Sequence, residues 1–337
     1  MKKRDKIDFS SLKAPGSYTS SLDDFTDFLK IVEDAEKKAE ELKTETESAK
    51  KAPAEKGAED SAPQESLEEL MAKLDALTGL EKVKDNVRSL INLVKVRKLR
   101  EENGLPNTEM SLHLVFMGNP GTGKTTVARL IAGLYREIGV LSKGQLVETD
   151  RAGLVAGYVG QTAQKTKKVI ESAMGGVLFV DEAYALAPEN GGNDFGREAV
   201  ETILKAMEDH RDDLVVIAAG YENEMERFIS SNPGLESRFN RYFIFEDYNG
   251  QELFEIFSSM CAKNSYILST EAKEFAITLF DRLYVNRDKN FGNARDVRNI
   301  FENMVSVHSD RIAALTKVDK ETLVTVLKDD LLKASEI

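Results

Sequence analysis

The chain is poor in cysteine and histidine, the residues that most often form crosslinks or hold zinc. A single cysteine, Cys261, excludes a disulfide within the chain. It lies in the run LFEIFSSMCAKN, whose helical pattern predicts a small buried side chain at that position. The three histidines, His113, His210 and His308, are far apart in sequence and show no zinc-binding spacing. Each histidine is therefore expected to be structural or on the surface.

Long hydrophobic runs are also absent. No segment approaches the roughly 20 apolar residues that are needed to cross a bilayer. The first residues, MKKRDKIDFSSL, lack the apolar centre of a secretory signal. We therefore expect a soluble, cytoplasmic protein without membrane insertion.

Positive charge is in short supply. The chain has 46 Lys and Arg residues against 58 Asp and Glu residues, a formal net charge of −12, and a pI near 5.0. A motor that grips DNA or RNA needs a basic surface to neutralise phosphates, so this balance argues against nucleic acid as the main partner. The apolar content of 41% over 337 residues is enough for two domains with buried cores and an additional tail.

What the sequence does contain is a phosphate-binding loop, GNPGTGKT, at residues 118–125. It lies between an apolar strand, LHLVFM, and a helical run, TVARLIAGLYREI, which is the context that this motif requires. Glycines let backbone N–H groups turn toward the phosphates, and the following helix presents its positive N-terminal end to the same anion. Lys124 is expected to reach the terminal phosphates and the Thr125 hydroxyl to ligate Mg²⁺. The predicted ATP-binding residues of this loop are Gly118, Asn119, Pro120, Gly121, Thr122, Gly123, Lys124, Thr125 and Thr126.

A second motif, GGVLFVDE at residues 175–182, favours hydrolysis over simple binding. Its apolar part predicts a buried parallel strand, and Asp181 and Glu182 follow at the carboxyl end. Ligands of open α/β sheets lie beyond the carboxyl ends of the strands, so both carboxylates are expected beside the phosphates. Asp181 is predicted to hold Mg²⁺ through its coordination shell, and Glu182 to polarise the attacking water.

The segments around these motifs resemble the AAA+ ATPase family. In the stretch LTGLEKVKDNV, the resemblance implies that Gly79 and Leu80 line the adenine pocket. The run DRAGLVAGYVGQTAQKTKKVIESA matches the pore-loop region, with Tyr158, Val159 and Gly160 as the residues that grip a polypeptide substrate. An aromatic side chain between glycines could instead pack against a neighbour, but Gly157 and Gly160 favour a ring that projects outward.

Two further segments extend this resemblance. The run LVVIAAGYENEMERFISSNPGLESRFNRYFIF is similar to the second region of homology, in which Arg238 is the candidate arginine finger and Arg241 the second inter-subunit arginine. The run FGNARDVRNIFENM is similar to the sensor-2 helix, and it implies that Arg295 contacts the γ-phosphate. A surface ion pair is the alternative for the two inter-subunit arginines.

Closer matching identifies the chain with the CbbX/CfxQ family of AAA+ proteins over about residues 66–335. The runs that carry this resemblance include VLSKGQLVETDRAGLV, GYVGQTAQKT, GGVLFVDEAY, AAGYENEM and NPGLESRF. The family includes red-type Rubisco activases, stage V sporulation protein K and the EccA ATPases of type VII secretion. The resemblance implies a hexameric ring. The sequence does not indicate which branch of the family the chain belongs to, which client protein it acts on, or whether a small molecule regulates it.

One position departs from the general AAA+ pattern, and the role of one segment is undecided from the sequence. The polar sensor-1 residue falls on Gly220 or Tyr221, with Asn223 slightly further on, so sensor 1 is left unassigned. The segment PENGGNDFGREA, residues 188–199, is equally consistent with a second pore loop or subunit interface and with a mobile turn.

Composition divides the chain into three parts. Residues 1–65 are polar and are expected to form a largely disordered tail or linker, with a possible helix at 21–50. The apolar residues of that helix either dock a partner or another subunit, or stay solvated. Residues 66–247 alternate apolar strands with amphipathic helices, which predicts an α/β parallel-sheet P-loop ATPase domain. From 248 to 337 the strands vanish and helical periodicity predicts a small, all-helical lid.

The combined hypothesis is a Mg²⁺-dependent ATPase, acting as a homo-oligomeric ring, that remodels a protein partner by pulling on an exposed segment. One alternative is a nucleotide-gated assembly or scaffold factor, in which ATP binding switches partner affinity. The other is a nucleic-acid motor or loader, which predicts stimulation by DNA or RNA that weakens with salt.

Overall fold

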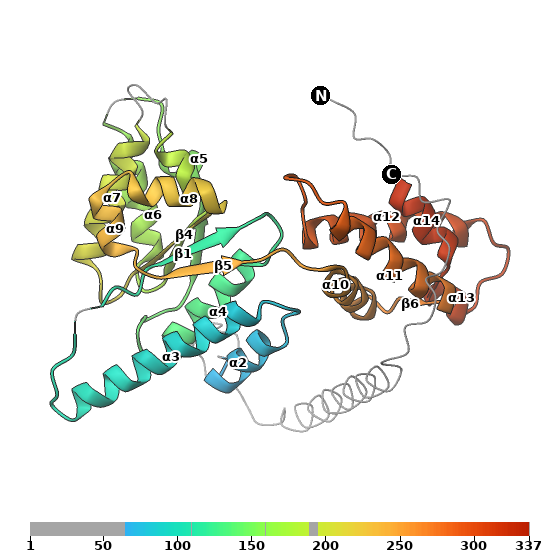
Figure 1. The fold of residues 1–337 in the computed structure, drawn as a ribbon, viewed down its shortest axis with the longest axis horizontal. Coiled ribbons are helices and arrows are strands. Elements are labelled where there is room, and N and C mark those ends of the chain that lie inside the picture. Colours follow the sequence, from blue (N-terminus) through green and yellow to red (C-terminus); the bar gives the residue numbers. More distant parts are fainter. Residues whose placement is uncertain (1–64, 109, 159, 189–194, 337) are drawn as a thin grey trace, which may run out of the picture. The chain divides into compact units, whose positions relative to one another are not determined.

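A five-stranded parallel sheet organises the first part of the described chain (Figure 1). The structure is a computed structural model that describes residues 65–108, 110–158, 160–188 and 195–336. The strand order is β2-β3-β4-β1-β5, so the chain crosses between strands through helices. The strands are β1 (Leu114–Gly118), β2 (Leu146–Thr149), β3 (Val177–Val180), β4 (Val215–Gly220) and β5 (Tyr242–Phe245).

The interior strands read as continuous apolar runs because both faces of the sheet are covered. Every residue of β3 and of β4 is buried. The predicted buried strand before Asp181 is therefore confirmed. At the sheet edge β5 alternates instead, with Tyr242 and Ile244 exposed and Phe243 and Phe245 buried.

Helices cover the two faces of the sheet and build two separate cores. On one face, a core that includes Phe116, Phe179, Phe243 and Phe245 packs beneath α2, α3 and α4. On the other face, a second core joins the sheet to α5 through α9. The helices of this part are α2 (Leu67–Asp75), α3 (Glu81–Glu102), α4 (Lys124–Glu137), α5 (Arg151–Leu154), α6 (Thr162–Ala173), the 3₁₀ helix η1 (Ala183–Leu186), α7 (Gly196–Asp209), α8 (Glu222–Ser230) and α9 (Pro233–Arg238).

The rest of the described chain is helical, as the periodicity predicts. It begins with α10, where the Asn249 side chain and Glu252 form a reciprocal capping box. Cys261 is buried in α10, as expected. The helices are α10 (Gly250–Lys263), α11 (Thr270–Val285), α12 (Ala294–Ala313), α13 (Lys320–Val324) and α14 (Lys328–Glu336).

One short sheet interrupts the expected run of helices. Strands β6 (Ile267–Leu268) and β7 (Thr325–Val326) pair in parallel, so the prediction that strands vanish after 248 is wrong at these four residues. The helical run predicted from 320 onward breaks because Thr325 and Val326 are β-branched and the Asp330 carboxylate accepts a hydrogen bond from the Leu327 N–H (2.9 Å). A new helix, α14, starts at that point.

Several sequence predictions lie outside the described residues. These are the possible helix at 21–50 and the rest of the tail to residue 64, Val159 of the pore-loop triplet, and residues 189–194 of the glycine-rich segment. Among the residues that the structure does describe, no helix is both long and apolar enough to span a bilayer.

Candidate nucleotide-binding site

The phosphate loop joins the end of β1 to the start of α4. Gly118, Gly121 and Gly123 all have positive φ values, of 152°, 71° and 94°. A Cβ atom at Gly118 would lie 2.4 Å from the Phe245 carbonyl oxygen, and one at Gly121 would lie 2.1 Å from the Gly292 carbonyl oxygen. Only glycine fits at these two positions, because the loop passes directly against β5 and the start of α12. The glycines allow this loop conformation, and the N-terminal end of α4 faces the loop.

Lys124 is the first residue of α4, and its side chain folds along the loop. The Nζ atom donates hydrogen bonds to the carbonyl oxygens of Gly118 and Asn119, both at 2.8 Å. Burial lowers the pKa of Lys124 to about 8, against the opposing effect of the Asp181 carboxylate, and Arg295 lowers it further. Lys124 is therefore close enough to Asp181, Glu182 and Arg295 for their charges to change its pKa.

The two carboxylates at the end of β3 are placed as the sequence predicts. The Asp181 N–H donates to the Thr149 carbonyl oxygen (2.8 Å), which continues the β2–β3 pairing for one more residue. Glu182 follows with a φ of 47°, a left-handed conformation that costs energy for a residue with a side chain. Such conformations often occur where a fold must aim a functional side chain.

These groups meet in one cavity of about 340 Å³. It brings together residues of the phosphate loop, both carboxylates and Arg295 of α12, which are predicted separately from sequence. Its lining is Gly118, Pro120, Gly121, Gly123, Lys124, Thr125, Thr126, Asp181, Glu182, Gly220, Tyr221, Ala294, Arg295 and Arg298. The predicted loop residues Asn119 and Thr122 lie behind this lining, where the Thr122 hydroxyl donates to the Asn119 carbonyl oxygen (2.8 Å).

Sequence reasoning missed Ala294 and Arg298 of this cavity and left Gly220 and Tyr221 unassigned. Arg298 lies three residues after Arg295 on α12, a spacing that places both on one helix face and could have revealed it. Tyr221 lines the cavity at the end of β4, where sensor 1 is expected, and its ring lies 6.1 Å from that of Tyr184. Asn223 is not part of the lining.

The oxygen atoms in the cavity suit a hard cation. Thr125 and Asp181 line the same space, and hydroxyl and carboxylate oxygens are the ligands that Mg²⁺ prefers together with phosphate and water. Within the described ranges, no group of three or more His, Cys, Asp or Glu side chains could form an all-protein metal cage. The donor set therefore fits a Mg²⁺ ion that arrives with a nucleotide.

A second cavity, of about 310 Å³, adjoins the other side of the phosphate loop. Leu80 and Tyr248 both line it, and both would contact a Cβ atom placed at Gly123. The Tyr248 hydroxyl donates to the Thr122 carbonyl oxygen (3.2 Å), and burial raises its pKa. Gly79 has a φ of 58° and faces Glu252 and Tyr248. Tyr248 has no motif signal in the sequence.

The two candidate inter-subunit arginines do not line the phosphate cavity of their own chain. Arg238 ends α9, and its Nη2 atom lies 3.1 Å from Glu208 Oε2 at the end of α7. Arg241 precedes β5, and its backbone carbonyl accepts a hydrogen bond from the Val115 N–H (2.9 Å). The Nε atoms of both arginines are buried without a hydrogen-bond partner among the described residues. Neither guanidinium is therefore fully satisfied by the residues that the structure describes.

Tyr158 lies on the connection between α5 and α6, and 73% of its surface is exposed. A Cβ atom placed at Gly157 or Gly160 would meet nothing within 4 Å, so the loop stands away from the described side chains. The interpretation of Tyr158 as a packed aromatic is therefore wrong. Its phenol ring is presented to the surroundings.

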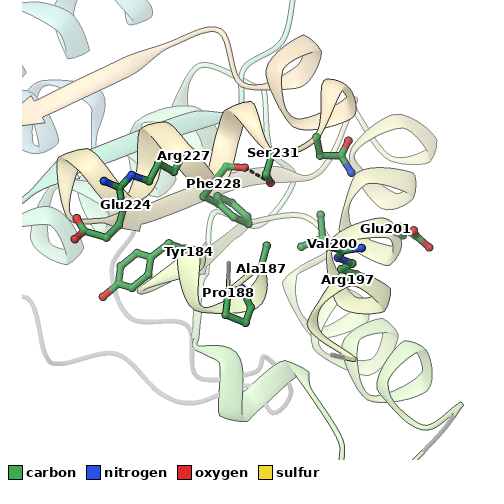
Figure 2. A pocket seen from close by; sticks show the side chains of 11 residues that line it. Tyr184, Ala187, Pro188, Arg197, Val200, Glu201, Glu224, Arg227, Phe228 and Ser231 are labelled. Carbon is green, nitrogen blue, oxygen red and sulfur yellow. Dashed lines mark hydrogen bonds between the residues drawn. The ribbon is translucent and has the colours of Figure 1, made fainter. Parts of the chain in front are cut away.

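Figure 2 shows a further cavity, of about 530 Å³, for which the sequence contains no motif. It lies between η1, α7 and α8, with Phe228 in the wall and arginines from both longer helices at its sides. Tyr184 lines this cavity and packs against Gly220 of the phosphate cavity, where a Cβ atom would lie 2.7 Å from the Tyr184 ring. The two cavities therefore share a wall.

Comparison with known proteins places these features in context. The model of the ATPase family associated with various cellular activities (AAA) matches residues 114–247, and the AAA lid domain model matches residues 249–336. Stage V sporulation protein K of Bacillus subtilis is 42% identical over 79% of this chain and 82% of its own length. Protein CbbX of Cereibacter sphaeroides is 43% identical over 83% of this chain and 89% of its own.

Two further matches concern another relative and the fold. The chloroplastic ribulose bisphosphate carboxylase/oxygenase activase of Cyanidioschyzon merolae is 42% identical over 80% of this chain and 93% of its own. A structure of a Thermotoga maritima RuvB mutant superposes with a TM-score of 0.52 at 19% identity, covering 78% of this chain and 71% of that one. At this low identity the RuvB match supports the fold alone.

Proposed function

The chain belongs to the CbbX/CfxQ family of AAA+ ATPases, and from this premise we propose that it hydrolyses ATP, with Mg²⁺, to remodel a protein partner. In this proposal the working form is a homo-oligomeric ring, a hexamer by the family resemblance. The client is a protein with an exposed segment, and nucleic acid is not the substrate.

The observation that carries the proposal is the convergence of Lys124, Thr125, Asp181 and Glu182 on one cavity. In the proposed reaction Lys124 leaves its two carbonyl partners to bind the terminal phosphates. Thr125 and Asp181 would hold Mg²⁺, which when bound neutralises charge on the β- and γ-phosphates. Glu182 orients the attacking water and accepts its proton.

Nucleotide selection is proposed for the adjoining cavity. Gly79 and Leu80 would contact the adenine, as the family resemblance implies, and Tyr248 is added to them here. The support is positional, because Leu80 and Tyr248 both approach Gly123 at the back of the phosphate loop. Arg295 and Arg298 would then approach the γ-phosphate from α12.

A neighbouring subunit is proposed to complete the site with Arg238, and with Arg241 in a secondary role. One support is that Arg238 does not line the phosphate cavity of its own chain. The other is that its guanidinium forms an ion pair with Glu208, whose side chain is 59% exposed. Exposed ion pairs are weak, so a phosphate group can replace Glu208 at little cost. Tyr158, with Val159 and Gly160, is proposed to grip the client through apolar contact.

The proposal is tested by ATPase rates with and without a protein extract of the organism that encodes the chain. We expect the extract to stimulate the wild type and a Tyr158→Phe variant, because both keep an aromatic ring at the loop. A Tyr158→Ala variant should assemble and hydrolyse ATP at the basal rate but lose the stimulation. Equal stimulation of all three proteins would contradict gripping by Tyr158 and favour a nucleotide-gated scaffold. Stimulation that nuclease treatment of the extract removes would favour a nucleic-acid motor.

A further inference from the structure

Asn293, the residue that precedes α12, has a backbone conformation that is strained for any residue with a side chain. Its φ is 51° and its ψ is −127°, a region that glycine adopts readily and other residues avoid. The residue is completely buried. A strained and buried polar residue persists only when its surroundings fix it in place, so its contacts indicate what it does.

Those contacts lead away from its own helix. Asn293 occupies the N-cap position of α12, yet its side chain makes no capping hydrogen bond to that helix. Its Nδ2 atom donates to Asp247 Oδ1 (2.8 Å) and to the Pro120 carbonyl oxygen of the phosphate loop (3.3 Å). Its Oδ1 atom accepts a hydrogen bond from the Tyr248 N–H (2.9 Å). The amide thus joins the phosphate loop to the segment between β5 and α10.

Neighbouring bonds strengthen the same junction. The Ala294 N–H donates to the Gly121 carbonyl oxygen (3.2 Å), one residue further along the phosphate loop. Asn119 Nδ2 donates to the same Asp247 Oδ1 atom (2.8 Å). Arg287 Nε lies 3.5 Å from Asp247 Oδ2, which balances the charge of this half-buried carboxylate. Three consecutive residues of the phosphate loop are therefore bonded into this junction.

We propose that Asn293 is a positioning residue that couples the phosphate loop to Arg295, two residues further on. The inference rests on the proposed function, in which Arg295 contacts the γ-phosphate. Nucleotide that orders the loop at Pro120 and Gly121 fixes Asn293, and Asn293 fixes the first turn of α12 with its arginine. The junction lets the start of the lid respond to the phosphate loop, and so it contributes to distinguishing ATP from ADP.

The sharpest test replaces Asn293 by aspartate. The Asn293→Asp side chain has nearly the same shape and keeps the acceptor for the Tyr248 N–H, but it places a carboxylate against Asp247 Oδ1. We expect kcat at saturating ATP to fall about tenfold and the preference for ATP over ADP to fall by a similar factor, a usual size for coupling between sites. Affinities are measured with fluorescent N-methylanthraniloyl derivatives of ADP and of a non-hydrolysable ATP analogue.

The matched control is Asn290→Asp. Asn290 lies in the same connection beside an aspartate, since its Nδ2 atom donates to Asp288 Oδ2 (3.2 Å), but it is exposed and does not contact the phosphate loop. This variant has the same change of charge and should keep the wild-type kcat and nucleotide preference within about twofold. A loss of kcat or preference like that of Asn293→Asp would overturn the inference.

A charge exchange tests the pair directly. Combining Asn293→Asp with Asp247→Asn restores a donor opposite an acceptor at this pair but not the bond to the Pro120 carbonyl oxygen, so it should recover only part of the lost kcat and ATP preference. If Asn293→Asp does not fold, Asn293→Gly serves instead, because it removes the same amide while relieving the positive φ. A purely structural role would lower the melting temperature of these variants while leaving kcat and the ATP preference unchanged, and that result overturns the inference.

The inference and the proposed function can fail separately. Arg295→Ala is expected to lose ATP preference if Arg295 contacts the γ-phosphate. Normal preference in Arg295→Ala would overturn the proposed role of the arginine. Lost preference in Arg295→Ala together with normal preference in Asn293→Asp would overturn the coupling alone.

Discussion

Lys124 shows at the scale of one residue how burial and function oppose each other. Its ammonium group is half-buried between two carbonyl oxygens, and burial lowers its pKa to about 8. Phosphate groups favour the charged form of a neighbouring lysine, so a bound nucleotide would raise this pKa again. Binding above pH 8 must therefore take up a proton.

This leads to a prediction about pH. We expect ATP affinity to fall as the pH rises from 7 to 9.5, approaching a tenfold loss per pH unit above a pKa of about 8. Calorimetry in buffers with different ionisation enthalpies should show proton uptake at pH 8.5. A Lys124→Arg variant binds more weakly but stays charged, so its residual affinity should lack this pH dependence. An unchanged dependence in that variant would assign the proton to another group.

Individual residues of the site differ in whether the sequence alone can predict their role. The spacing GNPGTGKT and the strand that precedes Asp181 and Glu182 predict the candidate site, because the chemistry of these motifs depends on neighbours in sequence. Asn293 and Pro120 are separated by 173 positions, and no local pattern reports their hydrogen bond. The same holds for Tyr248 against the Thr122 carbonyl oxygen.

At the scale of secondary structure, His113 links β4 to Phe239, the residue that follows α9. It precedes β1, its Nδ1 atom accepts a hydrogen bond from the Val216 N–H of β4 (3.0 Å), and its ring meets that of Phe239 edge-on at 6.3 Å. Burial lowers the pKa of His113 from 6.5 to about 4, and Arg238 adds to the effect. The imidazole is therefore neutral in the folded protein at neutral pH.

The sign of the resulting pH effect follows from linkage. Between pH 6.5 and about 4 the unfolded chain protonates His113 and the folded protein does not, so stability is lost as the pH falls through this window. We expect this residue to contribute a loss of about 3 kcal/mol of unfolding free energy. Urea unfolding from pH 7 to 4 should show a shallower loss for His113→Gln than for the wild type. The exposed His210→Gln variant should follow the wild type, and a wild-type slope in His113→Gln would contradict the account.

Helices and strands are predictable where periodicity is long and undisturbed. The buried strands β3 and β4 and the helices α10 to α12 follow from such patterns. The break at Thr325 is not predictable, because the bond from the Leu327 N–H to Asp330 and the pairing with Ile267 compete with a helical pattern that looks continuous. Tertiary contacts decide the structure at that point.

At the scale of the whole molecule, the central claim is that one chain holds only part of the machinery for hydrolysis. The phosphate cavity contains the carboxylates, the lysine and two lid arginines. The candidate finger Arg238 is paired with Glu208 of its own chain. Assembly would exchange that weak pair for a phosphate group in the next subunit, so hydrolysis should depend on contact between chains.

The most direct test is the ATPase rate per chain as a function of protein concentration, for the wild type and for mixtures of two inactive variants. The wild-type rate should rise steeply and then level off as chains assemble. Arg238→Ala lacks the finger and Glu182→Gln lacks the group that orients water, so each alone should be slower by about 10³-fold or more. Mixed together they should regain activity, because Glu182→Gln chains supply Arg238 to intact sites. Wild-type activity in Arg238→Ala alone, or a rate per chain independent of concentration in the wild type, would contradict the account.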